Sequence, residues 1–140
     1  MLNIFYLSIK LIKKIKKTKV IFFMKIKIIC FDIDNTICKT IKKQYSSSKP
    51  YKDVIKKINQ LYDMGYYIKI FTARYMGRCN EDVTKVNKIG YKKTKNQLIR
   101  WNLKFHELIM GKPSYDILVD DKEINFQKNW LKKIDKKLRI

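Results

Sequence analysis

The chain has 140 residues, which suffice for one domain with a substantial core but not for two. Hydrophobic residues make up 46%, and only four glycines and two prolines occur, so the composition excludes a disordered chain. The 33 Lys and Arg residues against 12 Asp and Glu residues give a formal net charge of +21.

The positive charge has two explanations. A basic surface gains affinity for nucleic acid by releasing counterions from phosphates, which allows nucleic acid as a partner. Nearly all the basic residues are Lys, however, and they are spread along the whole chain. Lys, Ile, Asn and Tyr are enriched together, as an A/T-rich coding sequence produces without a functional cause. A solvated, lysine-coated surface is therefore the favoured explanation.

Residues 1–23 form a separate N-terminal extension, and residues 24–140 form the domain. Apolar residues of the extension recur at helical spacing among many lysines, namely Ile4, Phe5, Leu11, Ile12 and Ile15. A basic amphipathic helix of this kind allows contact with an anionic membrane. The apolar stretch is too short and interrupted to span a bilayer. The alternative to a membrane-binding helix is that residues 1–23 are only an extension of the domain, or that the start is misassigned and the domain begins at Met24.

Four apolar runs predict strands, at about residues 25–31, 66–71, 108–110 and 117–119. Between the first two, an apolar face at helical spacing predicts a helix, with Pro50 at its first turn and Gly65 as its left-handed cap. A polar loop that holds Gly77, Arg78 and Gly90 is expected after the second strand. Two more helical faces follow, one of Tyr91, Thr94, Leu98 and Trp101 capped by Asn102, the other of Trp130, Leu131, Ile134 and Leu138.

Strands that alternate with helices predict an α/β fold, a single Rossmann-like, three-layer domain with a mostly parallel sheet. In such sheets, ligands bind beyond the carboxyl ends of the strands. Every reactive-looking group follows one of these ends: Asp32 and Asp34, Thr72, Lys112, and Asp120 with Asp121. We expect these side chains to meet at one edge of the sheet.

The acidic residues predict a metal ion at this edge. Four of the 12 acids fall into two tight clusters directly after apolar strands. Like charges side by side cost free energy unless a cation neutralises them. Carboxylates without histidine or thiolate partners suit Mg²⁺, which prefers oxygen ligands. His106 is the only histidine, and a packing role is expected for it.

These residue types suit phosphoryl transfer. Asp32 is the expected nucleophile, because its attack on phosphorus gives an acyl phosphate and splits hydrolysis into two easier steps. Asp34 is the expected acid and base for the leaving group and the water. Thr72 and Lys112 are expected to bind the phosphate oxygens. Arg74 is expected to contact the substrate, with a solvated loop as the alternative.

Four motifs, FDIDNT, IFTAR, GKP and ILVDD, occur in this order and resemble those of the haloacid dehalogenase (HAD) superfamily of aspartate-dependent phosphatases. The resemblance implies that Asp32 is the nucleophile and a ligand of Mg²⁺. It implies that Asp34 is the acid/base and binds the ion through its backbone carbonyl. It also implies Thr72 and Lys112 as phosphate-binding residues.

The resemblance further implies that Asp121, with Asp120 beside it, completes the metal site, and Asp121 is the favoured ligand. Asn35 departs from the family, which usually has Gly there, but Asn tolerates the left-handed conformation well. The longer phrases KPY and HELIMGKPSYDILVDDK are similar to small HAD proteins associated with capsule or surface-sugar synthesis. The insertions at residues 37–49 and 75–91 are too short for a cap domain, so the site is expected to be open.

The predicted function is therefore hydrolysis of a phosphorylated sugar or related metabolite by a magnesium-dependent phosphatase. One alternative is removal of a 3′-phosphate from a nucleic-acid end, as in the phosphatase half of polynucleotide kinase-phosphatases. Another is a non-catalytic basic binding module that keeps the fold. The cysteines Cys30, Cys38 and Cys79 show no CxxC spacing, and their odd number indicates a reduced, cytoplasmic protein without a zinc site.

Overall fold

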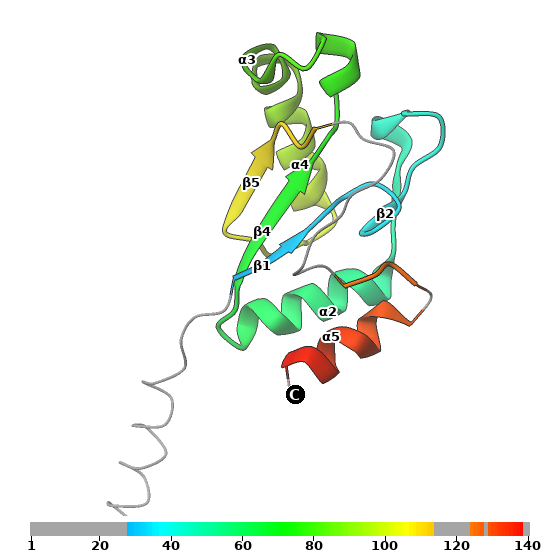
Figure 1. Cartoon of the computed structure of the whole chain (residues 1–140), viewed down its shortest axis with the longest axis vertical. Coiled ribbons are helices and arrows are strands. Elements are labelled where there is room, and N and C mark those ends of the chain that lie inside the picture. Colours follow the sequence, from blue (N-terminus) through cyan, green and yellow to red (C-terminus); the bar gives the residue numbers. More distant parts are fainter. Residues whose placement is uncertain (1–27, 114–123, 128, 139–140) are drawn as a thin grey trace, which may run out of the picture.

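The centre of the molecule is a parallel sheet of three strands in the order β1 (Ile28–Phe31), β4 (Tyr67–Thr72) and β5 (Glu107–Met110). The computed structural model describes residues 28–113, 124–127 and 129–138. Helices α2 (Lys52–Asp63), α4 (Lys92–Arg100) and α5 (Trp130–Leu138) pack around the sheet, as Figure 1 shows. The prediction of an α/β, Rossmann-like domain is confirmed. The extension at 1–23 and the strand expected at 117–119 lie outside the described residues.

The register of the sheet gives its two faces different characters. Ile29 pairs with Ile68, and Phe31 pairs with Ile70, which in turn pairs with Leu108, so these apolar side chains share one face. Helices α2 and α4 cover this face with fully buried side chains, among them Ile58, Leu61 and Leu98. Removing these side chains from water supplies most of the free energy that holds the helices on the sheet.

Helix α5 joins the same helical layer. The ring of Trp130 packs 6.1 Å from the ring of Phe31, and Lys57 of α2 forms an ion pair with Asp135. The other face of the sheet carries side chains that are exposed or half-buried, including Ile28, Cys30, Tyr67, Lys69 and Phe71. No helix among the described residues covers this second face, so the third layer stays a prediction.

Helix α2 forms where the sequence predicts it, but Pro50 does not lie in its first turn. Pro50 ends β3 (Lys49–Pro50), which pairs with β2 (Cys38–Lys39) in an antiparallel ribbon. Proline suits this place because the ribbon is short and needs no N–H donor there. The helix ends as predicted: Gly65 has a φ of 89°, and its N–H donates to the carbonyl of Tyr62 at 3.0 Å.

The prediction of a polar loop after β4 is wrong. This segment folds into η2 (Met76–Cys79), α3 (Val83–Val86) and the π-helical η3 (Asn87–Tyr91), which continues directly into α4. Asp82 caps α3 by accepting a hydrogen bond from the backbone N–H of Lys85 at 3.1 Å. Asn102 ends α4 with a φ of 55°, as predicted.

His106 has the packing role that the sequence predicts. Its ring stacks between those of Tyr62 and Tyr67, with centroid distances of 4.4 Å to each. Its Nδ1 accepts a hydrogen bond from the backbone N–H of Ile68 at 3.1 Å. None of the helices in the described part of the chain is long and apolar enough to cross a bilayer.

We predict that Gly90→Ala destabilises the protein whereas Gly77→Ala does not. A Cβ at Gly90 would lie 2.4 Å from the ring of Tyr75, while a Cβ at Gly77 would meet nothing within 4 Å. Forcing an extra methyl group into a packed site costs about 1–3 kcal/mol. Urea unfolding of both variants measures the difference, and equal stability of the two would contradict the packing described here.

Candidate functional site

The carboxyl ends of the three parallel strands bring the predicted residues to one edge of the sheet. Asp32 follows β1, Thr72 ends β4, and Lys112 comes two residues after β5. Lys112 Nζ lies 3.4 Å from Oδ1 of Asp32, and the Lys112 backbone N–H donates to the carbonyl of Thr72 at 3.1 Å. The convergence of these three residues at the edge is as expected from a parallel sheet.

A tight turn after β1 fixes the direction of the two aspartates. The carbonyl of Ile33 accepts hydrogen bonds from the backbone N–H groups of Ile37 at 2.8 Å and Cys38 at 3.2 Å. Asn35 takes the left-handed conformation that the turn requires, with a φ of 62°. Ile33 and Ile37 are fully buried and anchor the turn in the core. The two aspartates are therefore held by the fold rather than by a flexible loop.

The carboxylate of Asp32 is largely buried, with 31% of its side chain exposed. Burial raises the pKa of Asp32 above its ordinary value, and the nearby Asp34 charge adds to this rise. Lys112 and a hydrogen bond with the backbone of Ile33 oppose it without cancelling it. The ionised carboxylate is thus incompletely compensated by its protein neighbours.

Asp34 is held by a buried arginine. Arg74 Nε donates to Oδ2 of Asp34 at 2.9 Å, and Nη2 donates to Oδ1 at 2.9 Å, so the pair is bidentate. Thr40 Oγ1 lies 2.5 Å from Oδ1 of Asp34, and Ser48 Oγ lies 2.7 Å from the Thr40 hydroxyl. Both carboxylate oxygens are occupied by protein groups.

The structure places Arg74 differently from the prediction of a substrate contact or a solvated loop. Its side chain is only 1% exposed, and its remaining amino group, Nη1, donates to Oε1 of Gln97 at 2.6 Å. The guanidinium also lies over the ring of Tyr45, with Cζ 4.9 Å from the centroid. A guanidinium buried in this way has its donors committed to protein acceptors, so Arg74 supports Asp34 instead of meeting substrate.

Gln97 extends the network to the segment between β2 and β3. Its Nε2 donates to the carbonyl of Tyr45 at 2.6 Å. The ring of Tyr45 packs edge-on against that of Tyr75, and Arg78 donates to the carbonyl of Lys43 at 3.0 Å. The two insertions, predicted to be too short for a cap domain, therefore pack against each other as a rim beside the sheet edge.

Sequence reasoning missed Thr40, Ser48 and Gln97 as parts of the site. Ser48 stood in a serine run that indicated only a loop, and Gln97 lies 23 residues from Arg74 on a different element. The uncharged polar residues carry no spacing that marks them. The one indication in the sequence was Arg74, which follows a predicted strand. A buried arginine at such a place needs hydrogen-bond acceptors from other parts of the chain.

Thr72 lies at the edge but is fully buried. Its Oγ1 accepts a hydrogen bond from the backbone N–H of Arg74 at 3.2 Å, which leaves the hydroxyl proton for another acceptor. The role of Thr72 in phosphate binding stays a prediction, as does that of Lys112, whose side chain is 16% exposed.

The expected metal site is only partly within the described residues. Asp120 and Asp121 lie outside them, and no three His, Cys, Asp or Glu side chains within them gather as a metal site. Asp32 fits Mg²⁺, because it offers hard oxygen ligands whose charge lacks full compensation. The Asp34 carboxylate does not fit as a ligand while Arg74 holds both of its oxygens, so its backbone carbonyl is the group that remains.

The fold and the edge define an α/β protein with a Rossmann-like sheet and charged side chains at its carboxyl edge. A crystal structure of a structural genomics target from Vibrio cholerae is similar to this chain, with a TM-score of 0.68 and 23% sequence identity. The match covers 81% of this chain and 99% of that one. This likeness shows the fold alone. The chain matches no protein-family model and no curated protein.

We predict that Asp32→Asn stabilises the folded protein at neutral pH in the absence of Mg²⁺. Since the folded-state pKa of Asp32 is raised, its contribution to stability is complete below the unfolded pKa of about 3.9 and is lost as the pH rises. The amide removes this loss. Melting temperatures between pH 4 and pH 8 should show a gap that widens with pH. Asp53→Asn, at an exposed position on α2, should show no such stabilisation.

We predict that Arg74→Gln lowers the free energy of unfolding by about 3 kcal/mol, because it leaves the Asp34 carboxylate without its charged partner. Arg78→Gln, which removes an exposed arginine and its hydrogen bond to the carbonyl of Lys43, should cost only about 1 kcal/mol. The double variant with Asp34→Asn should lose less than the two single losses together. Additive losses in urea unfolding would show that the two side chains do not interact.

Proposed function

We propose that the protein is a magnesium-dependent phosphomonoester hydrolase that acts through an aspartyl-phosphate on Asp32, with a sugar phosphate or related metabolite as its substrate. The observation that supports this most is the position of Asp32. It lies at the carboxyl edge of the sheet, 3.4 Å from the ammonium group of Lys112, with a carboxylate that is incompletely compensated. The four motifs that resemble the HAD superfamily support the same assignment.

In the proposed reaction, a carboxylate oxygen of Asp32 attacks phosphorus while the bond from phosphorus to the leaving oxygen breaks. The leaving oxygen receives a proton from the carboxyl group of Asp34. Water then attacks the aspartyl-phosphate, loses a proton to Asp34, and releases inorganic phosphate and free Asp32. Lys112 offers positive charge to the phosphoryl oxygens.

Asp34 needs a change of partners to carry out its part. In the structure, both of its oxygens accept hydrogen bonds from Arg74. To carry a proton to the leaving group, one oxygen must leave the arginine and turn toward the substrate. We propose that Arg74 holds the resting orientation of Asp34 and receives it again after each turnover.

Mg²⁺ would be held by Asp32, the backbone carbonyl of Asp34, and Asp121 with Asp120 beside it. When bound, the ion supplies positive charge that offsets the repulsion between the Asp32 carboxylate and the phosphoryl group.

The thiols of Cys30, Cys38 and Cys79 are free in the structure, which supports the proposal of a reducing, cytoplasmic location.

We predict that the full chain hydrolyses p-nitrophenyl phosphate with Mg²⁺ and that Asp32→Asn abolishes turnover, because an amide is a poor nucleophile. The matched control is Asp53→Asn, which removes an exposed acid of α2 and should keep full activity. Release of p-nitrophenol measures both. No turnover by the folded wild-type chain would favour the non-catalytic binding module instead.

We predict that sugar phosphates are better substrates than 3′-phosphorylated oligonucleotides, and that their kcat/KM depends little on salt. A strand contacts several basic groups and releases counterions, so its kcat/KM should fall steeply with salt. Phosphate release at two salt concentrations measures both classes. Higher kcat/KM for the oligonucleotides at both would replace the sugar phosphate by a nucleic-acid end as the substrate.

A further inference from the structure

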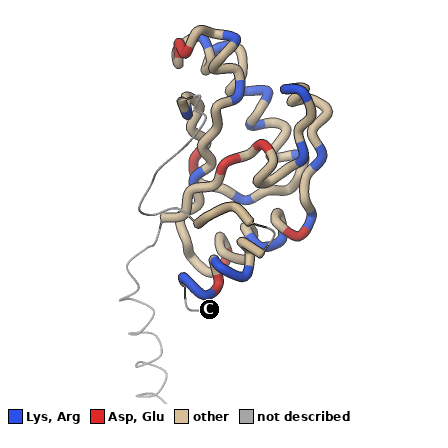
Figure 2. Tube along the Cα trace, turned by 45° about the vertical axis from the view of Figure 1, so that its right-hand side comes forward, with Lys and Arg blue, Asp and Glu red and all other residues tan. Residues whose placement is uncertain are grey.

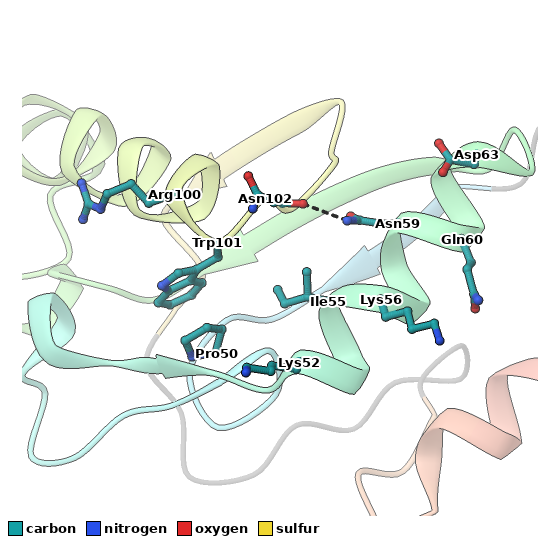
Figure 3. A pocket seen from close by; sticks show the side chains of 10 residues that line it. All are labelled: Pro50, Lys52, Ile55, Lys56, Asn59, Gln60, Asp63, Arg100, Trp101 and Asn102. Atoms are coloured by element: carbon teal, nitrogen blue, oxygen red, sulfur yellow. Dashed lines mark hydrogen bonds between the residues drawn. The ribbon is translucent and has the colours of Figure 1, made fainter.

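A hollow of the described surface lies away from the sheet edge, between α2 and the end of α4. It is an open groove of about 620 Å³. Figure 3 shows it from close by. Its walls come from Pro50 at the end of β3, from one side of α2, and from the residues that end α4. None of its lining residues is among those of the proposed active site.

The floor of the groove is apolar and includes one large aromatic side chain. The indole of Trp101 lies beside the ring of Pro50 and near Ile55 (Figure 3). Ile55 is 8% exposed, whereas Trp101 and Pro50 are half-buried, so their rings face solvent in part. A half-exposed indole on a rigid floor is a surface on which a flat ring can stack.

The rim of the groove is positively charged. Lys52, Lys56 and Arg100 line it and are exposed, and among the described residues they take part in none of the ion pairs. Asp63 is the acid of the lining, and both its oxygens accept hydrogen bonds from Lys104 Nζ at 2.8 and 2.9 Å. The groove therefore presents three available cations and a neutralised carboxylate.

The amide of Asn59, a polar group of the floor, is already occupied. Asn59 Nδ2 donates to the carbonyl of Asn102 at 2.8 Å, and its Oδ1 accepts from the backbone N–H of Lys104 at 2.8 Å. A ligand would find an aromatic face and positive charge here, and of the lining amides the Asn59 side chain is already committed to backbone groups. That combination suits a ligand recognised by its rings and phosphates rather than by its sequence.

We infer that this groove binds single-stranded nucleic acid, with a base stacked on Trp101 and phosphates along Lys52, Lys56 and Arg100. The groove follows α2 from Lys52 to Asp63, a length of about 16 Å at the rise of an α-helix. This length exceeds that of a single phosphate group and suits a short stretch of strand. The strand is a binding partner here, separate from the phosphomonoester that the sheet edge is proposed to hydrolyse.

The first test is the affinity of the full chain for a fluorescein-labelled oligothymidylate, measured by anisotropy without Mg²⁺. Trp101→Leu should weaken binding by roughly five- to 150-fold, the loss expected from one stacked base. The affinity of Trp101→Phe should lie between those of the wild-type chain and Trp101→Leu, because phenylalanine keeps an aromatic ring at this position. An abasic strand of equal charge should bind the wild-type chain as weakly as oligothymidylate binds Trp101→Leu.

The second test uses matched charge changes. Lys52→Gln with Lys56→Gln should reduce the steepness of log K against log salt by about 1.4, two phosphate contacts at about 0.7 each. Lys92→Gln with Lys93→Gln removes the same charge from exposed positions of α4 outside the groove and should leave the slope unchanged. Melting temperatures confirm that each variant is folded. If Trp101→Leu does not fold, the affinity of Trp101→Phe and the salt slopes of the two lysine pairs test the inference in its place.

Three outcomes would overturn the inference: equal binding of the abasic strand and oligothymidylate, equal effects of the two lysine pairs, or equal affinity for thymidine monophosphate and the strand. The last would indicate a pocket for a mononucleotide. All of these measurements can be repeated in Asp32→Asn. Trp101→Leu should lose strand binding and keep phosphatase activity, whereas Asp32→Asn should lose phosphatase activity and keep strand binding. The two variants therefore separate this inference from the proposed function.

Discussion

The buried pair between Arg74 and Asp34 is the interaction on which the site depends. A guanidinium that is 1% exposed is costly to bury, and the cost is offset only when each side of the group has an acceptor. Asp34 meets one side, and Gln97 meets the other. Asp34 lies in the turn after β1, Arg74 lies two residues after β4, and Gln97 lies on helix α4. The pair thus links the sheet edge, the helical layer and, through Gln97, the segment around Tyr45.

This network also explains why two short insertions can shape the edge without forming a domain. The segment between β2 and β3 is held by backbone carbonyls of Lys43 and Tyr45, and the segment after β4 is held by the rings of Tyr45 and Tyr75. Figure 2 shows that Lys and Arg positions are spread over many parts of the described chain, so the positive charge is not confined to one segment of it.

The sequence predicted the elements that rest on simple periodic patterns, and it failed where packing decides. The helix with Val54, Ile58 and Leu61 on one face and the cap at Gly65 follow from spacing and from glycine's conformational freedom. The segment after β4 looked polar because its buried side chains, Met76, Cys79 and Val86, are separated by Gly77, Arg78 and the mostly polar residues 80–85. Short helical turns of this kind are stabilised by contacts from distant elements, which a local pattern does not carry.

For the site, the sequence placed Asp32, Thr72 and Lys112 at one edge because the carboxyl ends of parallel strands must meet there. It could not place Arg74, because the partner that accepts its hydrogen bonds lies 40 residues away and the choice between solvent and Asp34 is made by tertiary packing. Its burial turns a predicted substrate contact into a support for an acid.

The π-helical turn at Asn87–Tyr91 affects the whole helical arm, by which we mean the continuous segment of α3, η3 and α4. A wide turn of this kind holds one residue more than an α-helical turn, and each residue of an α-helix advances by about 100° around the axis. Helix α4 is therefore rotated with respect to α3 by about that angle compared with an uninterrupted helix. The extra residue sets the phase in which Gln97 points at Arg74 and Thr94 and Leu98 point inward. Shortening this arm by a single residue would turn a different stripe of α4 toward the sheet.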